Sequence, residues 1–473
     1  MHQVEHQTLG VTSVFMRAAC LPRFSALAPC MVAAVVAALL VPTNPIDALA
    51  PGGWIEPQGS PVRARWTPAT VASIVPPVRG SFVFPAPYNT QAARITDAGD
   101  CGGTDCVWPV GYSYWRNTNA HEGSVEMLIF VGLAKEKGGT GPTLFKYDKR
   151  TDQISKVGPM FPPGSKFTNY TGEGWYFSAS RPTKLYMNDG PKMLRYDVLS
   201  QQFEPVFDVS QQFGPNRRIR QMHSSNDDLV HSATLQAADT GELLGCVVYS
   251  EAKRQYRFYA KIGRFDECNL DRSGRWTVSL EDIGVPKDIA NRIFDNDTGG
   301  ETRLNGPKGT LGHLDMGYGY MLGADNYNAL PNATIRWDFE PTVSQGPVLH
   351  RNPNWDVAEM NHISHENARS NVPLSGQYAC GSDVSPHAVQ NEITCIRLDG
   401  SNDQLIVAPV MTDPKGSGAV GSAGYYAKQP KGNLDITGTY FIWTTNLCGN
   451  RTDAFLVKVP GELLLGNAGG VRP

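Results

Sequence analysis

The sequence predicts an all-β protein, a β-propeller of seven four-stranded blades, on three observations. The 473 residues include 48 Gly and 34 Pro, and 10% are aromatic, which is typical of short strands joined by turns. A strand that ends in an aspartate recurs along the chain, and a second strand motif precedes it in several repeats. One small sheet cannot bury both of its faces, whereas a ring of stacked sheets does. Two β-sandwiches, or six or eight blades, are the alternatives.

The recurring strand alternates apolar and polar residues, then reaches an aspartate and a turn. Segment 144–148 (LFKYD) matches 193–197 (MLRYD), and the two aspartates lie 49 residues apart. The pattern returns at 292–295, 335–338 and 396–399. Alternation at period 2 followed by an aspartate indicates a strand that enters a tight turn.

Filling the gaps at this spacing gives one such strand for each of seven blades. The two segments RQYRFYAK and DAFLVKVP lack the aspartate and are assigned by spacing alone. The seven strands centre near Tyr147, Tyr196, Phe258, Phe294, Trp337, Leu398 and Leu456.

A second motif places an aromatic residue about five positions after an aspartate. Segments 269–276 (NLDRSGRW), 433–440 (NLDITGTY) and 313–320 (HLDMGYGY) share it, and in each the aromatic residue begins an apolar strand. We expect Trp175-Tyr176-Phe177 and Gln377-Tyr378-Ala379 to occupy the same strand position in other blades.

This D-x-x-G-x-[WY] turn followed by an apolar strand resembles the TolB-type and WD40-like propeller repeat. The resemblance covers most of residues 120–460 and implies the propeller fold. The sequence also resembles an uncharacterised family of exported bacterial propellers. Such degenerate motifs carry no specific function.

The amino terminus has the features of an export signal. Met31–Val41 is an uncharged apolar run, which is too short for a typical spanning helix. Ala48-Leu49-Ala50 resembles a cleavage site, but Pro51 disfavours cleavage, so an uncleaved anchor is the alternative. We therefore expect residues 1–50 to be a signal peptide or N-terminal anchor, 51–80 a lead-in and 81–473 the propeller. The expected location is secreted, periplasmic or on the cell surface, with no further membrane span.

Cysteine use fits export. Seven cysteines follow the leader, and pairing of sequence neighbours leaves Cys448 alone. Buried free thiols are the alternative, because spacing does not fix connectivity. The expected pairs, each closing a loop between adjacent strands, are Cys101–Cys106, Cys246–Cys268 and Cys380–Cys395.

The charge balance restricts the partners. There are 42 Lys and Arg against 45 Asp and Glu, for a net charge of −3 and no basic tract. A nucleic-acid partner is therefore not expected. We expect the protein to be a monomer and its partner to be a glycan or a protein.

The polar residue two positions before each motif aspartate lies where the innermost strand of a blade begins. Asn269, His313 and Asn433 hold this position, and His223 and His362 fall at a similar point. Different blades would then place Asn and His side chains around one channel mouth, where propellers commonly bind ligands. Alternatively, each histidine bonds the backbone at a blade edge.

A weaker similarity is to the oligogalacturonide lyases, which are seven-bladed propellers. It implies one divalent metal ion (Mn, Ca or Zn) held by histidines at the channel mouth. The matching residues by position are His313, His362 and His365. The family's glutamine ligand has no strict counterpart in this sequence, and Asn361 is the stand-in. Neutral imidazole is a good ligand for a transition-metal ion.

Lyase chemistry requires a cation against the uronate carboxylate and a base that removes the adjacent proton. Arg220 is the candidate cation, and His223 and Tyr327 are candidate proton-transfer groups. An aromatic strand at 110–115 supplies Tyr114, and His121 follows it; both suit contact with a sugar, although such a stripe is more often core.

Two functions of different classes remain open. One is a binding protein that holds a carbohydrate or protein at its central channel mouth, favoured because no strict catalytic motif occurs. The other is a polysaccharide lyase that cleaves uronic-acid glycans by β-elimination, favoured by the histidines, Arg220 and the aromatic strand. A hydrolase of another type is a third possibility.

Overall fold

In the computed structural model, all described residues belong to one compact unit, residues 49–473. The expectations for residues 1–50, Tyr327 and Asn361 lie outside the described residues. The described residues are 52–57, 59–60, 63–168, 174–282, 289–305, 311–324, 333–351, 362–382, 384, 392–401, 403–418, 424–449 and 451–466.

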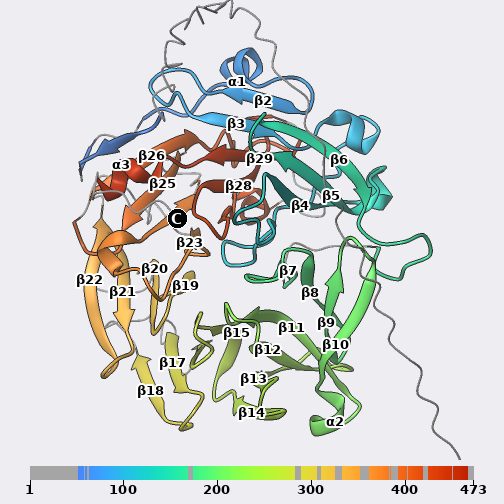
Figure 1. Ribbon diagram of the computed structural model, residues 1–473, viewed down its shortest axis with the longest axis vertical. Coiled ribbons are helices and arrows are strands. Elements are labelled where there is room, and N and C mark those ends of the chain that lie inside the picture. The colour runs from blue at the N-terminus through green and yellow to red at the C-terminus, as the bar shows by residue number, and fades with distance from the viewer. Residues whose placement is uncertain are drawn as a thin grey trace, which may run out of the picture. The chain divides into compact units, whose positions relative to one another are not determined.

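Seven antiparallel sheets form a ring around a central axis, which confirms the seven-bladed β-propeller (Figure 1). In blades 1 to 5 the strands follow chain order from the axis outwards, whereas blades 6 and 7 also contain amino-terminal strands at their outer edges. Blade 1 contains β4 (Glu126–Leu133), β5 (Gly141–Asp148) and β6 (Gln153–Pro159); blade 2 contains β7 (Tyr176–Phe177), β8 (Lys184–Asp189), β9 (Lys192–Asp197) and β10 (Gln202–Asp208); blade 3 contains β11 (Arg217–Ser224), β12 (Val230–Ala237), β13 (Leu243–Ser250) and β14 (Gln255–Ala260).

The remaining blades repeat this arrangement. Blade 4 contains β15 (Arg264–Leu270), β16 (Trp276–Asp282), β17 (Ile289–Asp295) and β18 (Glu301–Asn305); blade 5 contains β19 (Leu314–Met316), β20 (Tyr320–Ala324), β21 (Ala333–Asp338) and β22 (Ser344–Arg351); blade 6 contains β23 (His362–Ser364), β24 (Tyr378–Ser382), β25 (Glu392–Arg397) and β26 (Gln404–Pro409); blade 7 contains β27 (Asn433–Leu434), β28 (Tyr440–Thr445) and β29 (Asp453–Lys458).

The amino-terminal strands close the ring. β3 (Gln91–Arg94) pairs with β29, and β2 (Gly80–Val83) pairs with β3, so blade 7 is built from both ends of the propeller (Figure 1). β1 (Trp54–Glu56), within the expected lead-in, pairs with β26 of blade 6. The short helices are α1 (Pro68–Ile74), α2 (Ser210–Phe213), α3 (Gly461–Leu465), η1 (Ala98–Cys101), η2 (Lys135–Lys137), η3 (Leu374–Gly376) and η4 (Tyr425–Lys428). Among the described residues, no helix has the length and apolarity needed to cross a membrane.

The repeat found in the sequence corresponds to β5, the middle strand of blade 1, and to the third strand of the other blades except blade 3. Phe258 lies in β14, the outermost strand of blade 3, so its assignment as a third strand was wrong; the third strand is β13. That assignment rested on spacing alone. Tyr176 and Phe177 form β7, an innermost strand, rather than the second-strand position expected for them.

The aspartate of the second motif both shapes a turn and joins two blades. Asp271 accepts the backbone N–H of Trp276 at 2.9 Å, and Asp435 accepts that of Tyr440 at 2.6 Å. Asp271 also accepts the N–H of Gly319, in the next blade, at 3.0 Å. This dual role explains why an aspartate begins the turn, because one carboxylate has two oxygens for two sets of donors.

All three expected disulfides are present, and the thiol of Cys448 is buried. Only Cys380–Cys395 joins adjacent strands, where the two residues are directly opposed in β24 and β25. The expectation that every pair would do so was wrong for the other two. Cys246 lies in β13 and Cys268 in β15, so this bond links blade 3 to blade 4.

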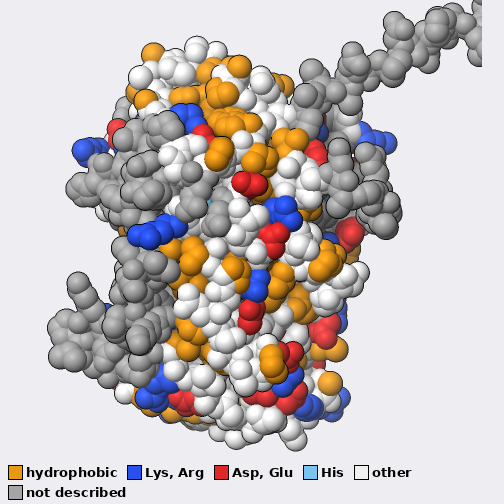
Figure 2. All heavy atoms as spheres, turned by 90° about the vertical axis from the view of Figure 1, so that its left-hand side faces the viewer, with side chains coloured by type: hydrophobic (Ala, Val, Ile, Leu, Met, Phe, Trp, Pro, Cys, Tyr) orange, Lys and Arg blue, Asp and Glu red, His pale blue; other side chains and the backbone are white. Residues whose placement is uncertain are grey.

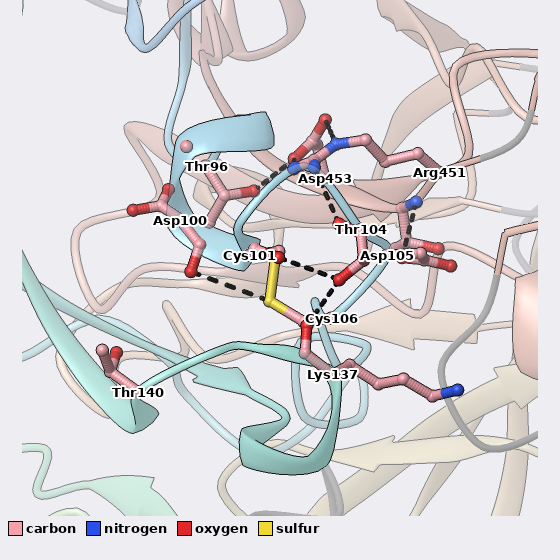
Figure 3. Close-up of a disulfide and its surroundings, with 12 residues drawn as sticks. Thr96, Asp100, Cys101, Thr104, Asp105, Cys106, Lys137, Thr140, Arg451 and Asp453 are labelled. Carbon is pink, nitrogen blue, oxygen red and sulfur yellow. Dashed lines mark hydrogen bonds and ion pairs between the residues drawn. A yellow bond between two sulfur atoms is a disulfide. The ribbon is translucent and has the colours of Figure 1, made fainter.

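The Cys101–Cys106 disulfide lies in the loop that joins η1 to blade 1 (Figure 3). Within this loop, the carbonyl oxygen of Thr104 accepts a hydrogen bond from Arg451 at 3.1 Å, and Asp105 accepts the N–H of Thr452 at 3.1 Å. The disulfide loop therefore attaches the entrance of blade 1 to the start of β29 in blade 7.

The segment between Cys106 and β4 is not the regular strand that the sequence predicts. Val107 bridges to Leu133 and Thr118 bridges to Ile129. On β4, the two bridged residues Ile129 and Leu133 lie four positions apart. In a regular antiparallel ladder their partners would also lie four positions apart, whereas Val107 and Thr118 are eleven positions apart. The seven extra residues leave the sheet as a loop. We call residues 108–117 the aromatic loop.

Candidate functional site

The aromatic loop is anchored to blades 3 and 4 by two of its aromatic side chains. The Tyr114 hydroxyl donates a hydrogen bond to Glu267 of blade 4. The Trp115 indole N–H donates to the carbonyl oxygen of Met222 in blade 3 at 2.8 Å.

The end of the loop is anchored to blades 2, 6 and 7. Arg116 donates to the carbonyl oxygen of Phe177 in blade 2 and forms a buried ion pair with Glu366 in blade 6. Asn117 exchanges hydrogen bonds with the side chain of Asn433 in blade 7 at 3.0 and 3.2 Å. The loop therefore fills the centre of the ring with side chains held from many sides.

A cavity of about 210 Å³ lies against this loop. It is smaller than the ~300–1,000 Å³ typical of sites for drug-sized ligands, and it suits one small polar unit. Aromatic, basic and acidic side chains from blades 1, 3, 4 and 5 meet around it. The lining residues are Tyr112, Tyr114, Trp115, Arg220, Gln221, Asp266, Glu267, Leu280, Gly312, His313 and Tyr426.

Two β-bulges shape one wall of the cavity. The register of β11 against β12 shifts between Arg220 and His223, and that of β15 against β16 shifts between Phe265 and Glu267. In a regular strand, consecutive side chains point to opposite faces. The bulges explain why the neighbours Arg220 and Gln221 both line the cavity. Bulges of this kind occur often beside functional sites, where they redirect side chains.

The same wall contains a strained residue and a second pair of neighbours. Gln221 has φ +47°, in the left-handed region that non-glycine residues adopt at a cost of about 1–3 kcal/mol. Asp266 and Glu267, at the other bulge, also line the cavity together. Strain of this kind persists where the surrounding structure fixes it, and it is concentrated at binding sites.

Glu267 connects the cavity to the aromatic loop. One carboxylate oxygen accepts the Tyr114 hydroxyl, and the other accepts the side-chain N–H of Asn269 at 3.1 Å. Burial, together with the negative charge of Glu267, holds the pKa of Tyr114 well above its usual range. Tyr114 is thus a neutral hydrogen-bond donor that fixes the carboxylate, and Asn269 supports the same carboxylate.

His223 lies beneath the aromatic loop. Its ring centroid is 5.4 Å from that of Tyr114 and 5.6 Å from that of Trp115. Burial, and then the positive charges of Arg272 and Arg116, lowers the pKa of His223 to about 3. Its Nε2 atom has no hydrogen-bond partner among the described residues. His223 is therefore a neutral imidazole that is a weak base.

His313 and His362 face each other at the channel. Their rings stack with centroids 4.5 Å apart and planes 28° apart. His362 is fully buried, and neither of its ring nitrogens has a hydrogen-bond partner in the part of the chain that the structure describes. Burial, followed by the charges of His313 and Lys431, holds the pKa of His362 well below its usual range.

His365 does not join this pair as the sequence led us to expect. Its Nε2 atom is hydrogen-bonded to the Tyr320 hydroxyl at 2.6 Å, and its Nδ1 atom faces Asn367 and the carbonyl oxygen of Tyr378 at 3.2 and 3.1 Å. Both ring nitrogens of His365 therefore already have hydrogen-bond partners. The described residues contain no group of three or more His, Cys, Asp or Glu arranged to hold a metal ion. The two facing imidazoles alone do not fit the expected three-histidine site.

His121 and Asn433 lie among structural contacts. The Nε2 atom of His121 is 2.8 Å from Asp435, and its Nδ1 atom is 3.1 Å from the Lys149 ammonium. Asp435 belongs to the turn after β27, so His121 joins blade 1 to blade 7 at the ends of the inner strands. Asn433, as described above, anchors the aromatic loop.

A buried ion network lies in the centre of the ring, close to His223. Arg272 contacts Asp315 at 2.6 Å and Glu366 at 3.0 Å, and Glu366 also pairs with Arg116. Burial raises the pKa of Asp315 to about 7; the charge of Glu366 adds to this effect, and that of Arg272 opposes it.

Several cavity residues were not found from the sequence. Tyr426, Gln221, Asp266 and Glu267 belong to no repeated motif. For Asp266 and Glu267, the one clue in the sequence was that they come shortly before Asn269, which the repeat identified. Tyr426 lies in a long connection between blades, where the repeat gives no information.

Comparisons with known proteins give the fold. No protein-family model matches the chain, and no curated protein matches its sequence. Among solved structures, it is similar to an oligogalacturonate lyase in complex with manganese, with 11% identity, a TM-score of 0.54, and 88% of this chain and 100% of that chain covered. It is also similar to an oligogalacturonate lyase from Vibrio parahaemolyticus, with 8% identity, a TM-score of 0.55, and 81% and 97% covered.

Proposed function

We propose that this chain binds a carbohydrate in the cavity beside the aromatic loop, at the mouth of the central channel. The observation that carries the proposal is the composition of the cavity lining, which combines aromatic rings with Arg220 and the carboxylates of Asp266 and Glu267. Sugars present apolar C–H faces and many hydroxyls, so aromatic and charged hydrogen-bonding groups complement both.

A protein partner is the other ligand class expected from the sequence. Figure 2 shows basic and acidic side chains interspersed on one side of the molecule, without a continuous basic surface there. The small volume of the cavity favours a sugar residue over a folded partner.

Isothermal titration calorimetry against soluble glycans tests the proposal. We expect wild-type protein to bind at least one oligosaccharide from a panel of neutral and uronic-acid oligomers. Arg220→Gln removes the cavity's arginine charge and should weaken uronic-acid ligands more than neutral ones. Arg217→Gln, on the same strand but outside the cavity lining, is the matched control. Absence of binding across the panel would refute the proposal.

Lyase action on uronic-acid glycans is the second candidate. It is favoured because Arg220 and His313 line the same cavity. Arg220 would neutralise the uronate carboxylate, and a neutral imidazole would take the adjacent proton. The electron pair of that C–H bond would form the C=C bond as the glycosidic C–O bond breaks, and the leaving oxygen would take up a proton. His313 lines the cavity and His223 does not, so His313 is the better candidate for the base. Absorbance of the unsaturated product, compared between wild type and His313→Gln, tests it.

We further propose that the protein is exported. Three disulfides are compatible with an oxidising compartment outside the cytoplasm. The apolar run at 31–41 supports the same proposal. Amino-terminal sequencing of protein from a cell fraction would show whether residues 1–50 are removed.

A further inference from the structure

The aromatic side chains around the cavity differ in how much surface they offer. Tyr112, Tyr114 and Trp115 are 6%, 4% and 1% exposed, whereas Tyr426 is 46% exposed. Tyr114 and Trp115 also use their polar atoms to hold the aromatic loop. A ligand that stacks on an aromatic ring needs an accessible ring, and Tyr426 is the most exposed aromatic residue in this lining.

Tyr426 is held in place by its neighbours. It lies in η4, and its hydroxyl is hydrogen-bonded to that of Tyr112. The Lys431 ammonium lies 3.6 Å from the centroid of its ring and 5.4 Å from that of Tyr112. A cation at this distance over an aromatic face is attracted to the ring, more strongly when it is desolvated.

Lys431 is itself arranged for this contact. It is buried although it carries a charged group, and its backbone has φ +41°. A lysine in the left-handed region costs about 1–3 kcal/mol and persists where other contacts fix it. The ring of Tyr426 is therefore oriented before any ligand arrives, which reduces the entropy lost on binding.

We propose that Tyr426 is the stacking platform for a pyranose ring at the cavity mouth and that Lys431 positions it. The ligand is a pyranose with an apolar C–H face, which lies on the exposed tyrosine while its hydroxyls reach Arg220 and Asp266. This inference rests on the proposed carbohydrate function and names the residue that sets its subsite. The rings of His313 and His362 lie 6.3 and 5.8 Å from that of Tyr426.

The test is calorimetric binding of one probe, the oligosaccharide that wild-type protein binds best among galacturonate and cellulose oligomers. Tyr426→Ala should raise Kd about tenfold, as expected for an aromatic anchor. Tyr426→Phe keeps the ring and should stay within about threefold of wild type, and Lys431→Met should fall between the two. Phe258→Ala removes a similarly exposed aromatic ring from β14 and should leave Kd unchanged.

The outcomes separate the two proposals. Near-ultraviolet circular dichroism and the unfolding midpoint show whether each variant retains the fold. If wild type binds the probe and folded Tyr426→Ala binds it equally well, the platform is refuted while carbohydrate binding stands. If wild type binds no oligomer, carbohydrate binding fails and the platform fails with it.

Discussion

Acid should weaken the fold through His223, and a single substitution isolates the effect. Burial lowers the pKa of His223 to about 3 in the folded protein, whereas an unfolded histidine titrates near 6.5. Below pH 6.5 the unfolded chain therefore binds a proton that the folded chain does not. Stability contributed by His223 is fully present above pH 6.5 and is lost as the pH falls.

The magnitude follows from the gap between the ambient pH and the unfolded pKa. At pH 5 the gap is about 1.5 units, and each unit corresponds to about 1.4 kcal/mol, so the loss is about 2 kcal/mol. Glutamine at this position has a similar polar side chain but takes up no proton. We therefore expect His223→Gln to be less stable than wild type at pH 7, and this disadvantage to shrink by about 2 kcal/mol at pH 5.

Urea unfolding of both proteins at pH 7, 6 and 5 measures this difference. The comparison removes other titrating groups, such as Asp315, because both proteins contain them. Parallel stability curves for the two proteins would show that His223 is protonated equally in the folded and unfolded states. That result would refute the assignment of a desolvated, neutral imidazole under the aromatic loop.

Three further predictions follow from the packing. Trp115→Ala should lower the free energy of unfolding by about 3–5 kcal/mol in urea titrations, because it removes a fully buried indole ring from the aromatic loop. Replacing Cys246 and Cys268 together by serine should cost about 3 kcal/mol, as expected for a crosslink of 22 residues; equal stability of this variant and wild type would contradict a structural role for the bond. Arg272→Met should cost about 3–5 kcal/mol at pH 8, because buried carboxylates lose their partner. The cost should be smaller at pH 6, because Asp315, whose pKa is raised to about 7, is then protonated. Circular dichroism melts of both proteins at pH 8 and pH 6 measure this difference.

The fold was largely predictable from local patterns. A strand that alternates apolar and polar residues and ends in an aspartate enters a turn, so the strand before each such turn was found from the sequence. Phe258 was misplaced because β14 also alternates apolar and polar residues. Such alternation does not show which strands pair with which, so it cannot tell an outer strand from a third one. The disulfide partners were correct, but the bond from Cys246 crosses between blades, which depends on packing that no local pattern encodes.

The candidate site was only partly predictable. The repeat located the inner strands, and so brought His223, His313 and His362 to the channel. It did not reveal the bulges that turn Gln221 and Asp266 towards the cavity, because a bulge is a mismatch between two strands. The aromatic loop has the composition of a strand, and only its pairing partners show that seven residues are in excess.

The aromatic loop also bears on how this protein folds. In a ring of repeats each unit usually contacts its neighbours alone, so stability is a sum of local terms and one part can open without the rest. Here the hydrogen bonds and ion pair of residues 114–117 span sequence separations from 61 to 316 residues. Opening any blade that the loop contacts would break a bond at the axis, so unfolding should be a single cooperative transition. Contacts of such long range also form late, and we expect slow refolding in which the centre becomes ordered last.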